Sequence, residues 1–259
     1  MPFTVSHAVA ALPFVRTPLP IAALVIGTMS PDLPYFLPLG VPRDLSHSLL
    51  GVVNIDLIVG IVVLAAWVLL LRAPLLDYAP GWLRERMPPR QRTNLLWMPV
   101  ALVVGSLTHL ALDLITHEGS LDHVLPVLAV ELGPLTVANV VHIVFSLVGG
   151  VILAVWVRRW VTRTARHAAS GIVSETERRL WWVGLIVAFV AMFSWIWGIQ
   201  FEASSGLFSV SSLFIAFCIP VGVLGFVTLI VSAVWHIRAR RARRQTERRT
   251  ATTLPSTVA

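Results

Sequence analysis

Three ionisable side chains lie on one stripe of an otherwise apolar segment, SLTHLALDLITHEGS. His109, Asp113 and His117 follow one another at intervals of four residues, so on a helix that turns by about 100° per residue they share one narrow face. An ionisable group in an apolar helix is strongly unfavourable unless it pairs, faces a polar cavity or binds a metal. The stripe therefore indicates a site, and it favours metal binding over the alternative, a buried polar network that joins helices.

The residue types in the stripe narrow the chemistry. Histidine and aspartate without cysteine are typical of hydrolytic zinc sites, and manganese or iron would also suit them. The single cysteine, Cys218, excludes a cysteine-based zinc site. A bound divalent ion lowers the pKa of its water to about 7, and a pair of ions also clamps a phosphoryl group. Because His109 and His117 are about 12 Å apart along a helix, either two ions lie along the stripe or one of its residues has another role.

Further candidate ligands come from other segments. His7 lies near the start of the sequence, Asp32 lies in SPDLPYF, and His47 lies in DLSHSLLG, just before the first long apolar run. His142 falls in the first two turns of the third run. Asp32 alone would be interpreted as a turn residue, but the predicted topology places all four residues and His117 at the same outer face of the bundle.

Neighbouring polar residues have less specific interpretations. Glu118, Asp122 and His123, in the loop after the stripe, could orient ligands or act as a general base, although solvated loop residues need no function. Asn54 and Asp56 lie deeper in the first apolar run. We expect both of them to join helices through hydrogen bonds.

The composition is that of an integral membrane protein. Of the 259 residues, 56 % are hydrophobic and only 13 % are charged, whereas about 25 % are charged in a soluble domain. This excludes a disordered protein and an ordinary soluble enzyme, and apolar runs long enough to cross a bilayer recur along the chain. We predict an all-α, polytopic membrane helical bundle with five transmembrane helices, over residues 49–71, 94–117, 136–157, 180–200 and 210–236.

The basic residues determine the predicted sidedness. All 20 of them are arginines, and most lie in three segments on one side of the spans: 72–93, 158–179 and the tail after His236. The connections on the other side, 118–135 and 201–209, contain no arginine. The positive-inside rule therefore places the tail in the cytoplasm and residues 1–48 outside. This asymmetry explains the net charge of +7, so no nucleic-acid partner is expected. The tail could bind anionic lipids or act only as a topology anchor.

The N-terminal apolar stretch is not expected to span the membrane. Prolines and Arg16 interrupt residues 8–29, which favours a re-entrant or interfacial helical segment over a crossing. The predicted organisation is a metal-site membrane domain, a basic cytoplasmic loop, two further spans and a basic, disordered cytoplasmic tail, over residues 1–157, 158–179, 180–236 and 237–259.

Four sequence elements together carry a family resemblance: MPFTVSH, GTMSPDLPYF, HSLLG and THLALDLITHEGS. Over residues 1 to about 157 the chain resembles the bacterial membrane family called domain of unknown function 4184. It is similar to membrane-bound metal-dependent hydrolases and, distantly, to zinc-dependent phospholipase C in ligand pattern. The resemblance implies five metal ligands, His7, Asp32, His47, His109 and Asp113, and His117 and His142 extend this set.

We therefore expect a metal-dependent hydrolase in a bacterial cytoplasmic membrane, with its site on the extracytoplasmic side. Its substrate would be a phosphoester or other ester of a lipid or lipid-linked molecule. One or two divalent ions would bind there, zinc before manganese or iron, and Glu118 or His117 would transfer the proton. One alternative is a transporter or ion-binding protein, which would need a polar path to the cytoplasm. Another is a non-catalytic scaffold with a structural metal.

Overall fold

The computed structural model describes residues 4–37, 39–87, 94–116, 124–133, 135–169, 171–203 and 210–253. Across these residues the regular secondary structure is helical apart from one short antiparallel pair, β1 (Glu131–Leu132) with β2 (Leu135–Thr136). Five helices within the described ranges are long and apolar enough to cross a membrane. The predictions of an all-α fold and of five such helices are therefore confirmed.

Short helices precede the first long one. They are η1 (Thr4–Phe14), α1 (Ile21–Met29), η2 (Ser30–Asp32), α2 (Leu33–Phe36) and α3 (Arg43–Ser46). The first long helix, Leu49–Tyr78, is a continuous run of α4 (Leu49–Gly51), η3 (Val52–Asp56), α5 (Leu57–Ala66), η4 (Trp67–Leu71) and α6 (Arg72–Tyr78). The η1 and η2 segments are 3-10 helices, whereas η3 and η4 are π-helical turns within the long helix.

The remaining helices of the described residues include four long ones and two short ones. They are α7 (Gly81–Arg84), α8 (Trp97–Thr116), η5 (Pro126–Ala129), α9 (Val137–Arg163), α10 (Glu175–Ala203) and α11 (Val210–Thr253). Many large apolar side chains on the outside of α9 and α10 are exposed, among them Leu147, Val151, Leu180 and Ile186 at 60–66 %. A soluble protein rarely exposes so much contiguous apolar surface. Lipid contact is the environment that suits these helices, which supports a multi-pass membrane protein.

The chain forms two compact units. Unit 1 consists of Met1–Ala65 and Pro88–Thr164, and unit 2 consists of Ala66–Met87 and Ala165–Ala259. The long helix Leu49–Tyr78 therefore contributes to both. This partition differs from the predicted boundaries at residues 157 and 180, because the second half of that helix packs with α10 and α11. Hydropathy locates spans along the chain but carries no information about which spans are neighbours.

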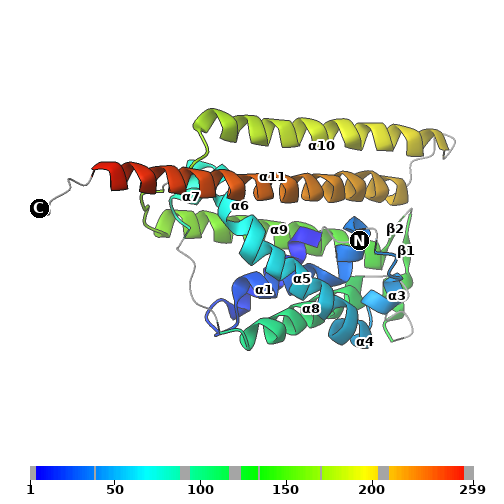
Figure 1. The fold of residues 1–259 in the computed structure, drawn as a ribbon. Coiled ribbons are helices and arrows are strands. Elements are labelled where there is room, and N and C mark those ends of the chain that lie inside the picture. Colours follow the sequence, from blue (N-terminus) through cyan, green and yellow to red (C-terminus); the bar gives the residue numbers. More distant parts are fainter. Residues whose placement is uncertain are drawn as a thin grey trace, which may run out of the picture. The chain divides into compact units, whose positions relative to one another are not determined.

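Unit 1 is organised by the close approach of α1 and α8, which lie side by side (Figure 1). Two glycines allow it. A Cβ atom on Gly27 would lie 2.3 Å from the carbonyl oxygen of Leu102, and one on Gly105 would lie 2.4 Å from that of Leu24. Small residues let apolar helices approach closely where no hydrophobic effect drives them together. The 3-10 helix η1 packs against α1, α8 and α9.

Unit 2 contains a buried polar group, Asp77, that links several of its elements. Asp77 Oδ2 accepts hydrogen bonds from the backbone N–H of Ile172 at 2.9 Å and from Trp235 Nε1 at 2.8 Å. The Asp77 carbonyl accepts one from Nε of Arg178, itself buried, at 3.0 Å. Because these donors lie on α10, on α11 and just before α10, the carboxylate and the carbonyl of Asp77 together fix α6 against this part of the unit.

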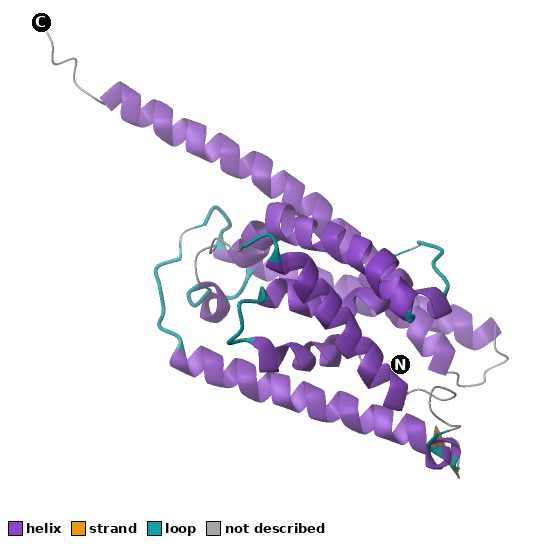
Figure 2. Ribbon diagram, turned by 90° about the horizontal axis from the view of Figure 1, so that it is seen from below, coloured by secondary structure: helices purple, strands orange, loops and turns teal. Residues whose placement is uncertain are grey.

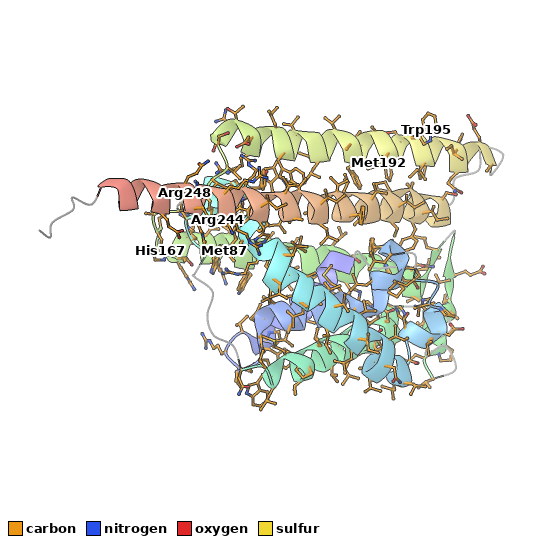
Figure 3. The ribbon with its side chains drawn as sticks, viewed as in Figure 1. Met87, His167, Met192, Trp195, Arg244 and Arg248 are labelled. Carbon is orange, nitrogen blue, oxygen red and sulfur yellow. The ribbon has the colours of Figure 1, made fainter. Side chains whose placement is uncertain are left out.

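The last helix, α11, continues to Thr253 (Figure 2). The sequence predicts a disordered tail from residue 237, so the structure differs here. The segment RARRARRQTERR contains mostly strong helix formers, and it extends a helix that has already begun, so no new nucleation is required. Arg238 also pairs with Glu177 of α10 at 2.8 Å. Figure 3 shows Arg244 and Arg248 on the final part of α11.

Candidate metal centre

Five of the predicted ligands lie together in unit 1, although they come from separate stretches of chain. His7 lies on η1, Asp32 ends η2, His47 follows α3, and His109 and Asp113 lie one turn apart on α8. Each of the five side chains is 10 % exposed or less. The structure therefore brings together the residues that the topology predicts to converge.

Local helix boundaries place Asp32 and His47. Helix α3 ends at Ser46, and His47 follows as its C-cap with a non-helical backbone. Ser48 then begins the first long helix, because its hydroxyl caps the backbone N–H of Gly51 at 2.9 Å. Asp32 lies in the 3-10 turn that follows α1, with Pro31 in that turn's first positions. His47 and Asp32 are thus held at the ends of short helices rather than on mobile loops.

The potential ligand atoms form two overlapping groups. One group is His7, Asp32 and His109, the other is His47, His109 and Asp113, and the atoms of each group lie within 4.8 Å of one another. Nε2 of His47 lies 3.4 Å from Asp32 Oδ1 and 3.5 Å from Asp113 Oδ2. Nε2 of His109 lies 3.7 and 3.6 Å from the same two oxygens. The two imidazoles and two carboxylates therefore face a common centre.

These separations fit the edges of a coordination shell. Zinc binds histidine nitrogen and carboxylate oxygen at about 2.0–2.2 Å in tetrahedral geometry, which places neighbouring ligand atoms about 3.3–3.6 Å apart. A charge-assisted N–H···O bond is shorter, at about 2.7–2.9 Å. The observed 3.4–3.7 Å thus match side chains that converge on a cation better than imidazoles hydrogen-bonded to carboxylates.

Hydrogen bonds on the far side of two imidazoles indicate which nitrogen faces the centre. Nδ1 of His109 lies 2.9 Å from the carbonyl of Thr28 and must donate to it, so in the neutral ring Nε2 carries the lone pair. Nδ1 of His47 lies 2.9 Å from Ser46 Oγ, whose own proton can go to the Arg43 carbonyl at 3.2 Å. Within the described residues, Nε2 of each ring is buried and makes no hydrogen bond. This arrangement is typical of metal-binding histidines.

Burial and neighbouring charges act differently on two groups at the site. Burial favours the neutral form of Asp32, but the imidazoles of His47 and His109, in their protonated form, outweigh it and hold the pKa of this carboxyl below its ordinary value of 3.8. Burial raises the pKa of Tyr35 to about 12. At neutral pH the centre therefore contains an ionised Asp32 and is bordered by a neutral phenol.

Other predicted site residues lie beside this cluster or outside the described ranges. Nδ1 of His142, on α9, is 3.3 Å from the carbonyl of Thr116 at the end of α8, and His142 belongs to neither ligand group. Four residues of the following segment lie outside the described residues: His117, Glu118, Asp122 and His123. The roles of these residues, and that of His142 as a ligand, stay predictions.

A second polar pair lies deeper along α8. Ser106 donates a hydrogen bond of 2.7 Å to Oδ2 of the buried Asp56, so the expectation that Asp56 joins helices is confirmed. The same expectation was wrong for Asn54. Asn54 lies on an exposed face of its helix, and its side chain donates to the carbonyl of Leu50 one turn earlier.

A cavity of about 320 Å³ adjoins the cluster, lined by Arg43, His47, Leu49, Leu110, Asp113 and Leu114. Arg43 Nη2 lies 3.4 Å from Asp113 Oδ2, and the Arg43 side chain is 41 % exposed. The sequence reasoning missed Arg43. The available signal was an arginine four residues before His47, on the side of the membrane where the positive-inside rule disfavours arginine.

Three imidazoles and two carboxylates form a donor set that suits zinc, iron or manganese. The two ligand groups share His109, so the set is compatible with one ion or with a pair. The adjoining cavity gives small molecules access to the side of the cluster formed by His47 and Asp113. Such access is a property of catalytic rather than of closed structural sites.

Comparison with known proteins identifies the family of this chain. The family model described as domain of unknown function (DUF4184) matches residues 1–235. No curated protein and no solved structure matches the chain. The family match includes every residue of the cluster and extends well beyond the region of about 157 residues in which the resemblance was recognised. The chain therefore belongs to the DUF4184 family.

Proposed function

We propose that this chain is an integral-membrane, metal-dependent hydrolase that acts on a phosphoester or other ester of a lipid or lipid-linked substrate. One observation carries the proposal. Five buried ligand-type side chains, from distant parts of an apolar chain, direct ligand atoms to a common centre beside a cavity. Buried carboxylates and imidazoles in this number are unfavourable without a partner that compensates them.

His7, Asp32, His47, His109 and Asp113 are the residues that would hold one or two divalent ions, with zinc the first candidate. A bound divalent ion supplies an acidified water and polarises the ester. The chain's own groups orient the ligands, because the Thr28 carbonyl and the Ser46 hydroxyl hold the rings of His109 and His47. We assign proton transfer during hydrolysis to Glu118 or His117.

The proposed topology places this centre at the extracytoplasmic face of a bacterial cytoplasmic membrane. The first long helix begins at Leu49 and α8 ends at Thr116, so both ends that border the centre lie at one membrane surface. In this arrangement the segment Ile21–Phe36, which is too short to span, re-enters from the same side. The C-terminal helix is cytoplasmic, where its arginines can contact anionic lipids.

Transport by the same residues is the main alternative. A transporter would need polar groups that continue from the centre through unit 1. One turn before His109 on α8, however, Ser106 donates its hydrogen bond to Asp56, so these two residues pair with each other. One turn further along α8 lies Leu102, which is fully buried, as is Leu24 of α1. The described residues therefore favour a centre closed toward the interior. A non-catalytic scaffold with a structural metal would not require the adjoining cavity.

Metal analysis of the protein purified in detergent tests the proposal. We expect near-stoichiometric zinc, manganese or iron in the wild type, and loss of it in both Asp32→Asn and His109→Ala, because these residues come from different helices of one centre. His167→Ala is the matched control, since His167 is exposed and lies in unit 2. A phosphoester and ester substrate screen follows on the loaded protein. The proposal fails if no metal copurifies and none can be loaded.

A further inference from the structure

We propose that Arg43 binds the phosphoryl oxygens of an amphiphilic phosphoester, whose apolar part lies against Leu49, Leu110 and Leu114. This inference rests on the proposed function and specifies its substrate class. It assigns to Arg43 a role in binding substrate and not in binding metal. It also divides the cavity into a polar end and an apolar wall.

The polar end is formed by Arg43, His47 and Asp113. The guanidinium of Arg43 offers five N–H donors in a fork that matches phosphate oxygens. Its Nη2 donates a long hydrogen bond of 3.4 Å to Asp113 Oδ2. The Arg43 side chain is nevertheless 41 % exposed, so its other N–H donors are accessible. Arg43 is therefore placed next to the ligand atoms and also accessible from the cavity.

The charge at this position selects for an anion. If the carboxylates of Asp32 and Asp113 bound one divalent ion, the formal charge of the centre would be zero, and Arg43 would raise it to +1. A carboxyl ester is neutral when it binds, whereas the oxygens of a phosphoester already carry negative charge that the guanidinium can bind. Arg43 thus favours phosphoesters among the esters that the centre could hydrolyse.

The apolar wall faces the region where lipids would lie. Leu49 starts the first long helix and Leu114 lies in the last turn of α8, so both lie at the helix ends that border the centre. Leu49 is 74 % exposed and Leu114 is 49 % exposed. An acyl chain can cover these side chains while its phosphate reaches Arg43, and a free soluble phosphoester would leave them uncovered.

Binding measurements on the metal-loaded, full-length protein test the inference without requiring turnover. The probes are inorganic phosphate and dioctanoyl phosphatidic acid, titrated calorimetrically into wild type, Arg43→Gln, Arg43→Lys and Leu114→Ala. The matched control is Arg158→Gln, since Arg158 is an exposed arginine at the other end of unit 1, on α9. Metal content is measured for every variant beforehand.

We expect Arg43→Gln to keep its metal and to bind both probes at least tenfold more weakly, with partial recovery in Arg43→Lys. Leu114→Ala should weaken phosphatidic acid binding only, and Arg158→Gln should change neither. Unchanged phosphate binding by metal-loaded Arg43→Gln would overturn the role of Arg43, as would loss of metal in that variant. Wild type that binds phosphate as tightly as phosphatidic acid would refute the amphiphilic substrate. Failure of the wild type to hold metal at all would instead refute the proposed function.

Discussion

Replacement of Gly105 by alanine should separate the two halves of the candidate metal centre. The new Cβ would lie 2.4 Å from the carbonyl oxygen of Leu24 and 2.7 Å from the backbone nitrogen of Thr28. Both are backbone atoms of α1, which cannot rotate away as a side chain can. Helix α1 contains the Thr28 carbonyl that holds His109, and it continues directly into η2, which ends at Asp32. A shift of α1 is therefore transmitted to both ligands.

The size of the shift follows from the contact distances. An ordinary contact begins at 3.4 Å, so α1 must withdraw from α8 by about 1 Å. Metal sites tolerate about 0.2 Å of error in ligand position, and weakened orienting groups reduce metal affinity about 10–100-fold. The strain of overpacking, about 1–3 kcal/mol, also exceeds the gain of about 1 kcal/mol from replacing a helical glycine. We therefore expect a less stable protein that binds metal at least tenfold more weakly.

Gly150→Ala is the matched control, because a Cβ on Gly150 of α9 would meet no atom within 4 Å. Competition with a chromogenic chelator measures zinc affinity, and thermal unfolding in detergent measures stability. Gly150→Ala should match the wild type in affinity and equal or exceed it in stability. If Gly105→Ala also binds zinc like the wild type, the close approach of α1 and α8 does not position the ligands, and our account of the centre is refuted.

Two further predictions concern groups beside the ligands. Ser46→Ala removes the hydroxyl that orients the His47 ring, so metal affinity should fall about tenfold at unchanged stoichiometry; unchanged affinity would show that the hydroxyl has no orienting role. Tyr35 should ionise near pH 12, and Tyr78→Phe leaves it the only tyrosine, so absorbance at alkaline pH reports it alone. Because the unfolded chain loses this proton near pH 10, the folded protein should lose stability between about pH 10 and 12. A midpoint of the Tyr35 absorbance titration near pH 10 would contradict the burial of this phenol.

Hydropathy and spacing predict much of this fold because they depend on single segments. A membrane-spanning helix is recognised by its own length and composition, and the four-residue interval between His109 and Asp113 already places both on one face of α8. The convergence of His7, Asp32 and His47 follows from topology, since the positive-inside rule places residues 1–48 outside, beside the outer ends of the spans.

The features that sequence reasoning missed depend on contacts between segments. The division into two units results from the helix neighbours of Leu49–Tyr78, and lateral neighbours leave no periodic signal in the chain. Gly27 and Gly105 resemble any other small residues until α1 and α8 are paired. Asn54 could not be assigned from the sequence for a similar reason. The direction of its side chain decides whether it bonds to a neighbouring helix or to the backbone of its own helix, as it does here.

The geometry of the cluster argues for a cation rather than for a polar knot. In a polar knot the lone pairs and protons satisfy one another, as they do for Ser106 and Asp56 at 2.7 Å and for the donors around Asp77 at 2.8–3.0 Å. The ligand atoms of His47 and His109 stand 3.4–3.7 Å from the carboxylates, although their opposite nitrogens make bonds of 2.9 Å. One chain thus contains closed polar pairs and, at this one cluster, well-oriented groups held apart at coordination distance. A divalent cation bound as we propose would take lone pairs from both imidazoles and from both carboxylates, and it would account for these separations.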